Sequence, residues 1–178
     1  PNLTSVKDNI APIGDMLKHL IPGRRKSTLA QVDQASIAKR PCFLCWENKP
    51  EEQLSLTACF DEPFSIRINP YPILPHHLTI SSLAHQPQTL ADKTSRQLPG
   101  RILKWMAATF GPDSQTRERP SMTLFYNGAS CGASAPDHFH FQAADAELIP
   151  LIRLIKSHPD KDFIESGQAQ TPDGHGCR

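Results

Sequence analysis

Residues 137–142 read DHFHFQ, and in this segment polar His138, His140 and Gln142 alternate strictly with Phe139 and Phe141. Successive side chains of a β-strand point to opposite faces. The pattern therefore predicts a strand with Phe139 and Phe141 on one face and His138, His140 and Gln142 on the other. The three polar groups would repeat at roughly 6.6 Å, two residues of strand rise. Positions i, i+2 and i+4 do not share a face of a helix, so this alternation favours a strand whose polar face carries the chemistry.

Four further segments of short alternating or apolar sequence predict strands. They are Leu54–Phe60, Phe64–Asn69, His77–Leu83 and Ser121–Tyr126. The first two are separated by a Glu-Pro break, which favours an antiparallel pair. With the segment at 137–142, this predicts an α+β fold: an antiparallel sheet of about five strands with helices packed on one face.

Helical periodicity predicts the remaining elements. The expected helices cover 13–21, 27–39 with Ser27 as N-cap, 88–97, 100–110 and 146–157, the break at 97–100 being set by Pro99. We therefore expect an N-terminal helical segment over 1–40, one domain over 41–157, and a poorly structured tail over 158–178.

Composition narrows the classes of partner. The 178 residues carry a net charge of +1, which predicts neither a nucleic-acid groove nor an anionic membrane as partner. No apolar run approaches the roughly 18 residues of a membrane span. An odd count of five cysteines favours a reducing compartment, and the cytoplasm is the expected location. Since the sequence begins at Pro1, we expect its natural start to lie upstream.

Residues 41–50 form a proline-bounded segment, PCFLCWENKP, that contains Cys42 and Cys45. Two thiolates spaced C-x-x-C can bind one tetrahedral zinc ion. A thioredoxin-like redox pair would need a following helix in a βαβ unit, which the sequence after Pro50 does not predict. A base deaminase would need an upstream H-x-E, which is absent. A structural zinc knuckle is favoured, with two buried free cysteines as the alternative.

Histidines elsewhere in the chain are the expected partners of the two cysteines. One histidine near 76–85 and one of His138 and His140 would complete four ligands. The spacing of His138 and His140 is shorter than the H-x3–5-H of zinc fingers. One of the two is therefore expected to bind metal and the other to be free to react.

The segment from Phe125 through Gln142 resembles the active-site segment of galactose-1-phosphate uridylyltransferases, which belong to the histidine-triad superfamily. That motif is a His-x-His-x-Gln strand preceded by a Phe-x-Asn and a loop of small residues. Residues 42–45 resemble the zinc knuckle of the family, residues 78–85 its strand that ends in a zinc-ligand histidine, and residues 69–73 its nucleotide-contacting segment. The end of the motif is also similar to the GDP-hexose phosphorylases. The chain differs at Asp137 and Phe139, where uridylyltransferases carry proline.

The resemblance implies a role for each matching residue. Structural zinc would be held by Cys42, Cys45, His85 and His138. His140 would be the nucleophile and Gln142 would donate to a phosphoryl oxygen. The substrate-binding residues would be Asn69, Asn127, Ser130, Gly132, Ser134 and Gln142. Nothing after residue 145 predicts a second module of this family, so we expect that module to lie outside this sequence.

The sequence thus predicts a nucleotidyltransferase or phosphorylase acting on a nucleoside diphosphate sugar or a dinucleoside polyphosphate. A nucleotidyl-histidine intermediate would divide one displacement into two. Two alternatives remain open: a histidine-triad nucleotide hydrolase, and a non-catalytic zinc-stabilised nucleotide-binding module. The expected partner is a nucleotide or nucleotide-sugar substrate. A homodimer is the candidate assembly.

Overall fold

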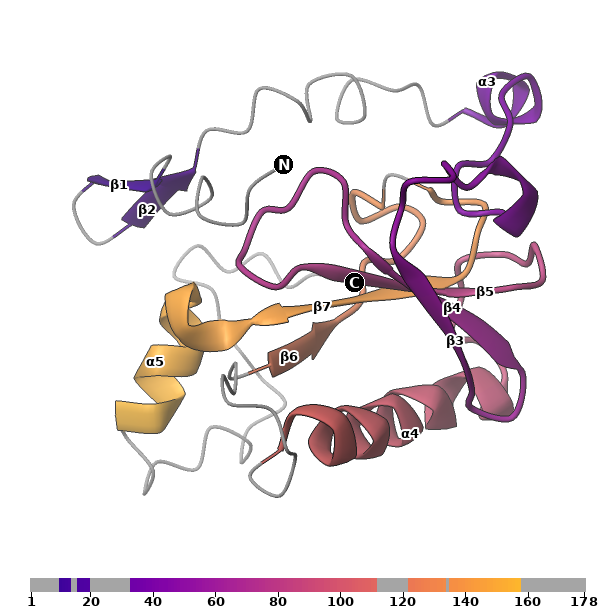
Figure 1. Cartoon of the computed structure of the whole chain (residues 1–178). Coiled ribbons are helices and arrows are strands. Elements are labelled where there is room, and N and C mark those ends of the chain that lie inside the picture. The colour runs from indigo at the N-terminus through magenta and orange to yellow at the C-terminus, as the bar shows by residue number, and fades with distance from the viewer. Residues whose placement is uncertain (1–9, 14–15, 20–32, 112–121, 134, 158–178) are drawn as a thin grey trace. The chain divides into compact units, whose positions relative to one another are not determined.

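A computed structural model describes residues 10–13, 16–19, 33–111, 122–133 and 135–157 (Figure 1). The chain divides into two compact units, residues 1–146 and residues 147–178. No helix of the described part is long and apolar enough to cross a membrane.

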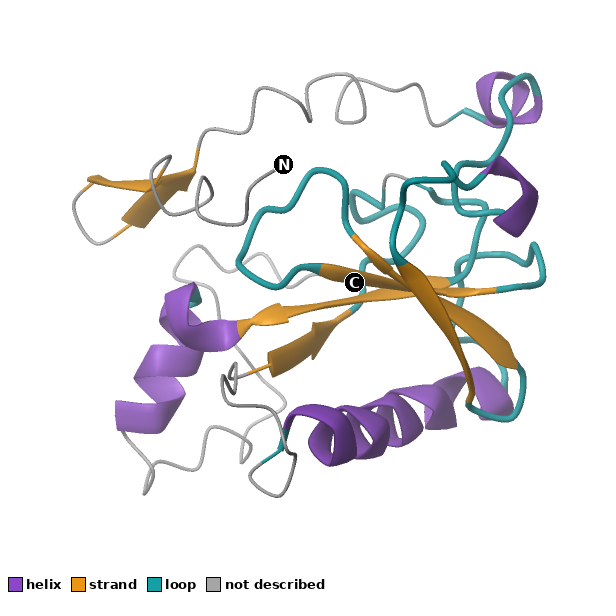
Figure 2. Cartoon of the chain, viewed as in Figure 1, coloured by secondary structure: helices purple, strands orange, loops and turns teal. Residues whose placement is uncertain are grey.

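Five strands of the first unit form one antiparallel sheet in the order β3-β4-β5-β7-β6, drawn in orange in Figure 2. The strands are β3 Ser55–Cys59, β4 Pro63–Ile68, β5 Leu78–Ser82, β6 Met122–Phe125 and β7 His140–Asp145. The predicted α+β class, the strand number and the antiparallel pairing of β3 with β4 are confirmed.

The register separates an apolar from a polar face of this sheet. One row across β4, β5 and β7 is apolar and consists of Ile66, Ile80 and Phe141. The adjacent row points the other way and consists of Ser65, Ser81 and His140. Because side chains alternate along each strand, the polar side chains form a continuous row across the three central strands, and all three are buried.

The apolar face is covered by helix α4, Lys93–Phe110 (Figure 1). Leu98, Ile102 and Met106 of the helix are buried in one cluster with Phe139 and Phe141. The two phenylalanine rings meet edge to face with centroids 5.3 Å apart, a favoured aromatic geometry. The predicted burial of both rings is confirmed, and it fixes which face the histidines occupy.

Strand β7 begins later than the alternation predicted, at His140 rather than at Asp137. Residues 138 and 139 precede the ladder but still alternate, because two backbone hydrogen bonds hold them: Phe139 N–H to Gln86 O at 2.7 Å and Ser82 N–H to Phe139 O at 3.0 Å. The strand also runs further, to Asp145.

Helix α4 corrects the prediction of two helices over 88–97 and 100–110. It is one helix that starts at Lys93 and includes Pro99. Asp92 caps it by accepting the Ser95 N–H at 2.8 Å, so residues 88–92 lie outside it. Pro99 cannot donate to the carbonyl one turn earlier. Burial of Leu98 and Ile102 on either side of it offsets that loss.

The predicted helix over 13–21 is wrong. Ile10–Ile13 and Met16–His19 form a two-stranded antiparallel sheet, β1 and β2, with Ile13 paired to Met16. The two residues between the strands in the sequence are Gly14 and Asp15, a hairpin signal that outweighs the helical spacing.

Of the predicted helix over 27–39, the described part is α3, Gln34–Ala38. It is capped by Asp33, which accepts the Ser36 N–H at 3.0 Å. Ser27 lies outside the described residues.

The last predicted helix, over 146–157, is divided. A 3-10 turn, η3, covers Ala146–Leu148, and helix α5 covers Pro150–Ser157. Proline is favoured at the first position of a helix because its missing N–H has no partner there. The predicted tail over 158–178 lies outside the described residues.

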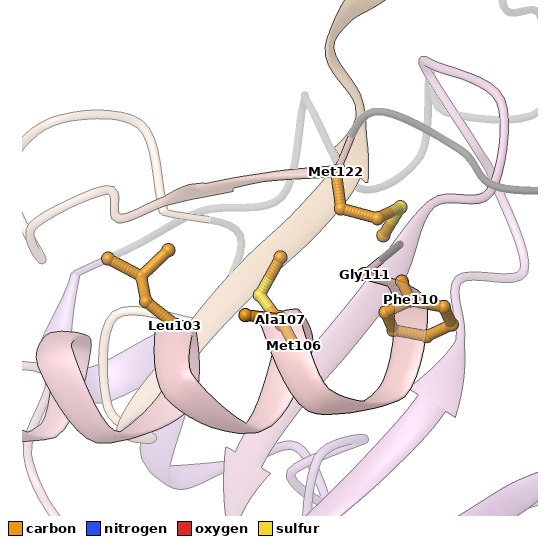
Figure 3. Close-up of a pocket in the computed structure, with 6 residues that line it drawn as sticks. All are labelled: Leu103, Met106, Ala107, Phe110, Gly111 and Met122. Carbon is orange, nitrogen blue, oxygen red and sulfur yellow. The ribbon is translucent and has the colours of Figure 1, made fainter. Parts of the chain in front are cut away.

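One apolar pocket lies between α4 and β6 (Figure 3). It is lined by Leu103, Met106, Ala107, Phe110, Gly111 and Met122. Met106 belongs to the apolar core and Met122 packs against that core, so this pocket is on the side of the sheet opposite the histidines. It carries no polar side chain suited to the predicted chemistry.

A pair of glycine substitutions tests the account of α4. Gly100 is exposed within the helix, and a Cβ there would meet no atom within 4 Å. Gly100→Ala should raise the free energy of unfolding by about 0.5–1 kcal/mol. Gly132→Ala, also in open space but at φ +83°, should lower it by about 1 kcal/mol. Urea denaturation measures both; equal effects of the two substitutions would contradict the account.

Candidate metal centre and nucleophile site

The segment that carries Cys42 and Cys45 folds into a tight knuckle. The Cys45 N–H donates to Cys42 O at 3.1 Å, and the Asn48 side-chain amide donates to the same carbonyl at 2.9 Å. A single 3-10 turn, η2 Trp46–Asn48, follows. Both thiols are buried, and this turn directs them to one point.

Two histidines from distant parts of the chain meet these thiols. His138 Nδ1 lies 3.3 Å from Cys42 Sγ and 3.6 Å from Cys45 Sγ. His85 Nδ1 lies 3.2 Å from Cys45 Sγ. All four ligand atoms lie within 4.8 Å of one another. Donors on one tetrahedral zinc ion would be spaced by about 3.5 Å, so the cluster has the dimensions of a metal site.

Hydrogen bonds fix which nitrogen of His138 faces the cluster. The Ser82 carbonyl lies 2.8 Å from His138 Nε2. A carbonyl only accepts, so Nε2 carries the proton and Nδ1 keeps its lone pair. A hydrogen bond from the other ring nitrogen to a carbonyl or carboxylate is typical of metal-binding histidines. His85 Nε2 faces a carboxylate beyond hydrogen-bond distance: Asp137 lies 3.8 Å from Nε2, and Arg40 lies 3.7 Å from the same carboxylate.

The electrostatics of the cluster suit a cation. Burial, with the adjacent Cys42, raises the pKa of the Cys45 thiol to about 12. Burial also lowers the pKa of His138, which keeps its imidazole neutral, the form that ligates metal. A bound dication would offset the free-energy cost of burying two negatively charged thiolates side by side. Two cysteines and two histidines are a donor set that zinc prefers, so these residues fit a zinc ion.

Arg67 on β4 supports the knuckle and was not predicted from the sequence. It is 1% exposed. Its Nε donates to Ser65 Oγ at 2.7 Å, its Nη1 to Phe43 O at 3.4 Å, and its guanidinium lies 5.6 Å from the Trp46 ring. Burial lowers the pKa of Arg67, opposed by the charges of Cys42, Cys45 and Glu47. The contacts tie the knuckle to the sheet.

His140 is the first residue of strand β7 and lies on its polar face. It follows His138, a member of the candidate metal cluster, by two residues. Its Nδ1 lies 2.8 Å from the backbone carbonyl of His138, so Nδ1 carries the proton and the lone pair is on Nε2. Burial lowers the pKa of His140, which favours the neutral ring. The result is a neutral ring, 4% exposed, whose unprotonated nitrogen is Nε2, the form that the predicted role of nucleophile requires.

Gln88 holds the backbone of His140 and was also missed from the sequence. Its Oε1 accepts the His140 N–H at 2.7 Å, while its Nε2 donates to His140 O at 3.0 Å and to Asn127 O at 2.7 Å. Strands β6 and β7 pair only from Phe125 and Gln142 onwards. The Gln88 amide therefore replaces a strand partner where β6 diverges.

Gln142 lies two residues further along the same face as His140. Its Oε1 lies 2.9 Å from Nε2 of the buried His77. Gln142 is paired with Thr79 on one side and with Phe125 on the other. The two predicted catalytic side chains therefore share one face and have fixed surroundings.

The predicted substrate-binding residues divide into two groups. Asn69 is used within the fold: its Nδ2 donates to Thr79 Oγ1 at 3.1 Å and its Oδ1 accepts the Tyr71 N–H at 2.9 Å. Asn127 contributes its carbonyl to Gln88. Ser130 and Gly132 are exposed in the loop before His138, whereas Ser134 lies outside the described residues.

A family model described as a domain of unknown function (DUF4922) matches residues 7–145. No curated protein and no solved structure matches the sequence. The matched span contains the metal cluster together with His140 and Gln142.

Metal binding can be tested with two cysteine substitutions. Cys42→Ser should remove stoichiometric zinc from the purified protein and lower its melting temperature, because a structural metal contributes folding free energy. Cys59→Ser is the control, since Cys59 is exposed on the edge strand β3. Elemental analysis by mass spectrometry and thermal unfolding measure both. Retention of one zinc per chain by Cys42→Ser would contradict the assignment.

The hydrogen bonds of Gln88 predict a large loss of folding stability when its amide is replaced by a carboxylate. Gln88→Glu keeps an acceptor for the His140 N–H but loses both donor bonds. It leaves the buried carbonyl of His140 and the partly buried carbonyl of Asn127 opposite a carboxylate. We expect a loss of about 2–5 kcal/mol in the free energy of unfolding, because each unsatisfied buried group costs about 1–3 kcal/mol. Gln97→Glu, on the exposed side of α4, is the control and should change stability by less than about 0.5 kcal/mol. Equal denaturation midpoints of the two variants would refute this role.

Proposed function

This chain belongs to the DUF4922 family, and we propose that it is a histidine-triad-like nucleotidyltransferase or phosphorylase. Its substrate would be a nucleoside diphosphate sugar or a dinucleoside polyphosphate. The nucleotidyl group would be carried on His140. The observation that carries the proposal is the hydrogen bond from His140 Nδ1 to the His138 carbonyl at 2.8 Å, which leaves Nε2 as the free nucleophile.

The first step is attack of His140 Nε2 on the α-phosphorus of the substrate. An N–P bond forms, the bond from phosphorus to the bridging oxygen breaks, and the leaving group takes the electron pair. The leaving group is the sugar 1-phosphate of a nucleoside diphosphate sugar or the second nucleotide of a dinucleoside polyphosphate. The His138 carbonyl supports this step, because it is placed to stabilise the positive charge that develops on the ring. In the second step an acceptor phosphate oxygen attacks the same phosphorus and His140 regains its lone pair.

Gln142 supports the proposal from the same face. Its Oε1 is taken by His77, so the amide NH2 is the group left to meet a phosphoryl oxygen. A preorganised donor of this kind stabilises the charge that grows in the transition state. The small side chains of the loop at 128–133, which include Gly128 and Gly132, are compatible with close approach of backbone to phosphate.

A zinc ion held by Cys42, Cys45, His85 and His138 would supply a structural cross-link rather than a reacting group. All four ligands are protein side chains, as in closed structural sites. The cross-link would join the knuckle, the end of β5 and the start of β7. Its effect on the reaction would be to hold the His138 carbonyl in place for His140.

Discharge of the same intermediate by water would give a hydrolase. Analysis of the products in the presence and absence of inorganic phosphate and sugar 1-phosphate separates transfer from hydrolysis. Nucleoside monophosphate formed at the same rate with and without either acceptor would favour hydrolysis.

Covalent labelling tests the intermediate. Incubation with a nucleoside diphosphate sugar labelled at the α-phosphate should give labelled protein that is stable to base and labile to acid. His140→Gly should abolish the label and still bind zinc, because the substitution removes the nucleophile and none of the four metal ligands. Added imidazole should restore turnover in that variant. His76→Asn, at an exposed neighbour of His77, is the control and should label like the natural protein.

Two results would contradict the intermediate. One is an active protein that never carries label. The other is a His140→Gly variant that is labelled as fast as the control.

A further inference from the structure

We infer that His77 is a positioning residue that turns the amide of Gln142, so that its NH2 group and not its carbonyl is presented to the phosphoryl group. The inference rests on the proposed function and adds a residue to it. His77 lies 65 positions before Gln142 in the chain, and its ring contacts that amide directly.

The directions of the hydrogen bonds that join the His77 ring to Ile73 and Gln142 follow from one obligate donor. The Ile73 backbone N–H points at His77 Nδ1, with a distance of 3.1 Å. Since an N–H only donates, Nδ1 must accept, and the proton of the neutral ring must be on Nε2. His77 Nε2 is 2.9 Å from the Gln142 side chain. The donor at Nε2 requires the carbonyl oxygen of Gln142 there, so the amide orientation is determined by the backbone at Ile73.

The ring of His77 is held so that it cannot turn over. It is 1% exposed, and its centroid lies 5.8 Å from that of the Phe125 ring. Its backbone carbonyl accepts the Asn69 N–H at 2.9 Å. The loop between Asn69 and His77 contains three prolines, which fix φ at those positions. A flipped ring would lose the bonds to both Ile73 and Gln142.

The amide orientation decides the sign of the dipole that faces the substrate. Among the described residues no acceptor takes a hydrogen bond from Gln142 Nε2, and Gln142 shares its face with His140. With NH2 toward the site, the amide attracts phosphoryl oxygens. With the carbonyl toward the site, it would repel them. His77 therefore acts on the reaction through Gln142, and its effect should vanish when the amide is absent.

Two substitutions separate the two bonds of His77. Asn at this position mimics Nδ1 and keeps an acceptor for Ile73, but it loses the donor to Gln142. Gln mimics Nε2 and keeps that donor. Gln142→Met removes the amide at similar volume. The rate of label incorporation in a single turnover with nucleoside diphosphate sugar is measured for H77N, H77Q, Q142M and H77N/Q142M, with zinc content as the check on folding.

The inference predicts a non-additive cycle. H77N and Q142M should each slow labelling by about 10²-fold or more, the usual effect of losing one transition-state donor. The double variant should label at the rate of Q142M, since residues that act as a unit are not additive. H77Q should label at least about tenfold faster than H77N. Zinc content should stay at that of the natural protein.

Losses that multiply in the double variant, or equal rates for H77N and H77Q, would overturn the inference. A natural protein that never labels would instead refute the proposed function, so the two failures are distinct. Should H77N not fold, the long-range ¹H–¹⁵N spectrum of the natural protein decides. A proton on Nε2 of His77 is expected, and a proton on Nδ1 would overturn the inference.

Discussion

The backbone carbonyl of His138 links the two halves of the site. It accepts the proton of His140 Nδ1 at 2.8 Å, while the His138 ring donates its own Nε2 proton to Ser82 O at 2.8 Å. Two histidines separated by one residue therefore have opposite tautomers. The unprotonated nitrogen of His138 is Nδ1, which faces the cysteines, and that of His140 is Nε2, the nitrogen that we propose as the nucleophile. A change that moves this carbonyl would therefore alter the positions of both histidine rings.

Three buried supports keep the carbonyl in place. The phenylalanines at 139 and 141 bury the opposite face against α4, which prevents the strand from turning over. Gln88 replaces the missing strand partner of His140. Arg67 ties the knuckle to β4 through Phe43 O and Trp46. Each support uses a different interaction (packing, neutral hydrogen bonding, and a buried cation), yet all act on one short segment.

Structural features that depend on nearby residues in the sequence were predicted correctly. Alternation identified the central strands and the buried pair Phe139 and Phe141. The C-x-x-C spacing, with the family resemblance, identified Cys42, Cys45, His85 and His138, which the fold brings together. Local helical periodicity led to wrong predictions where tertiary burial or a turn signal opposed it. Helix α4 continues through Pro99, where Leu98 and Ile102 are buried, and residues 10–13 pair with residues 16–19 as antiparallel strands.

The residues that sequence reasoning missed share one property: their role is a hydrogen bond to a distant segment. Gln88 bonds Asn127 and His140, and His77 bonds Gln142. Neither has a local pattern that marks it, since an isolated Gln or His is compatible with a surface position. The buried Arg67 is similar, because its partners Phe43 and Trp46 are 20 or more positions away in the chain. Only the assembled sheet shows what these side chains do.

The long-range ¹H–¹⁵N correlation spectrum of the zinc-loaded protein, labelled at histidine, tests the central claim most directly. The account predicts that His140 is neutral with its proton on Nδ1, and that His138 has its proton on Nε2 with Nδ1 bound to the metal. A proton on Nε2 of His140 would contradict it, because the nitrogen that we propose as the nucleophile would then have no lone pair for attack on phosphorus.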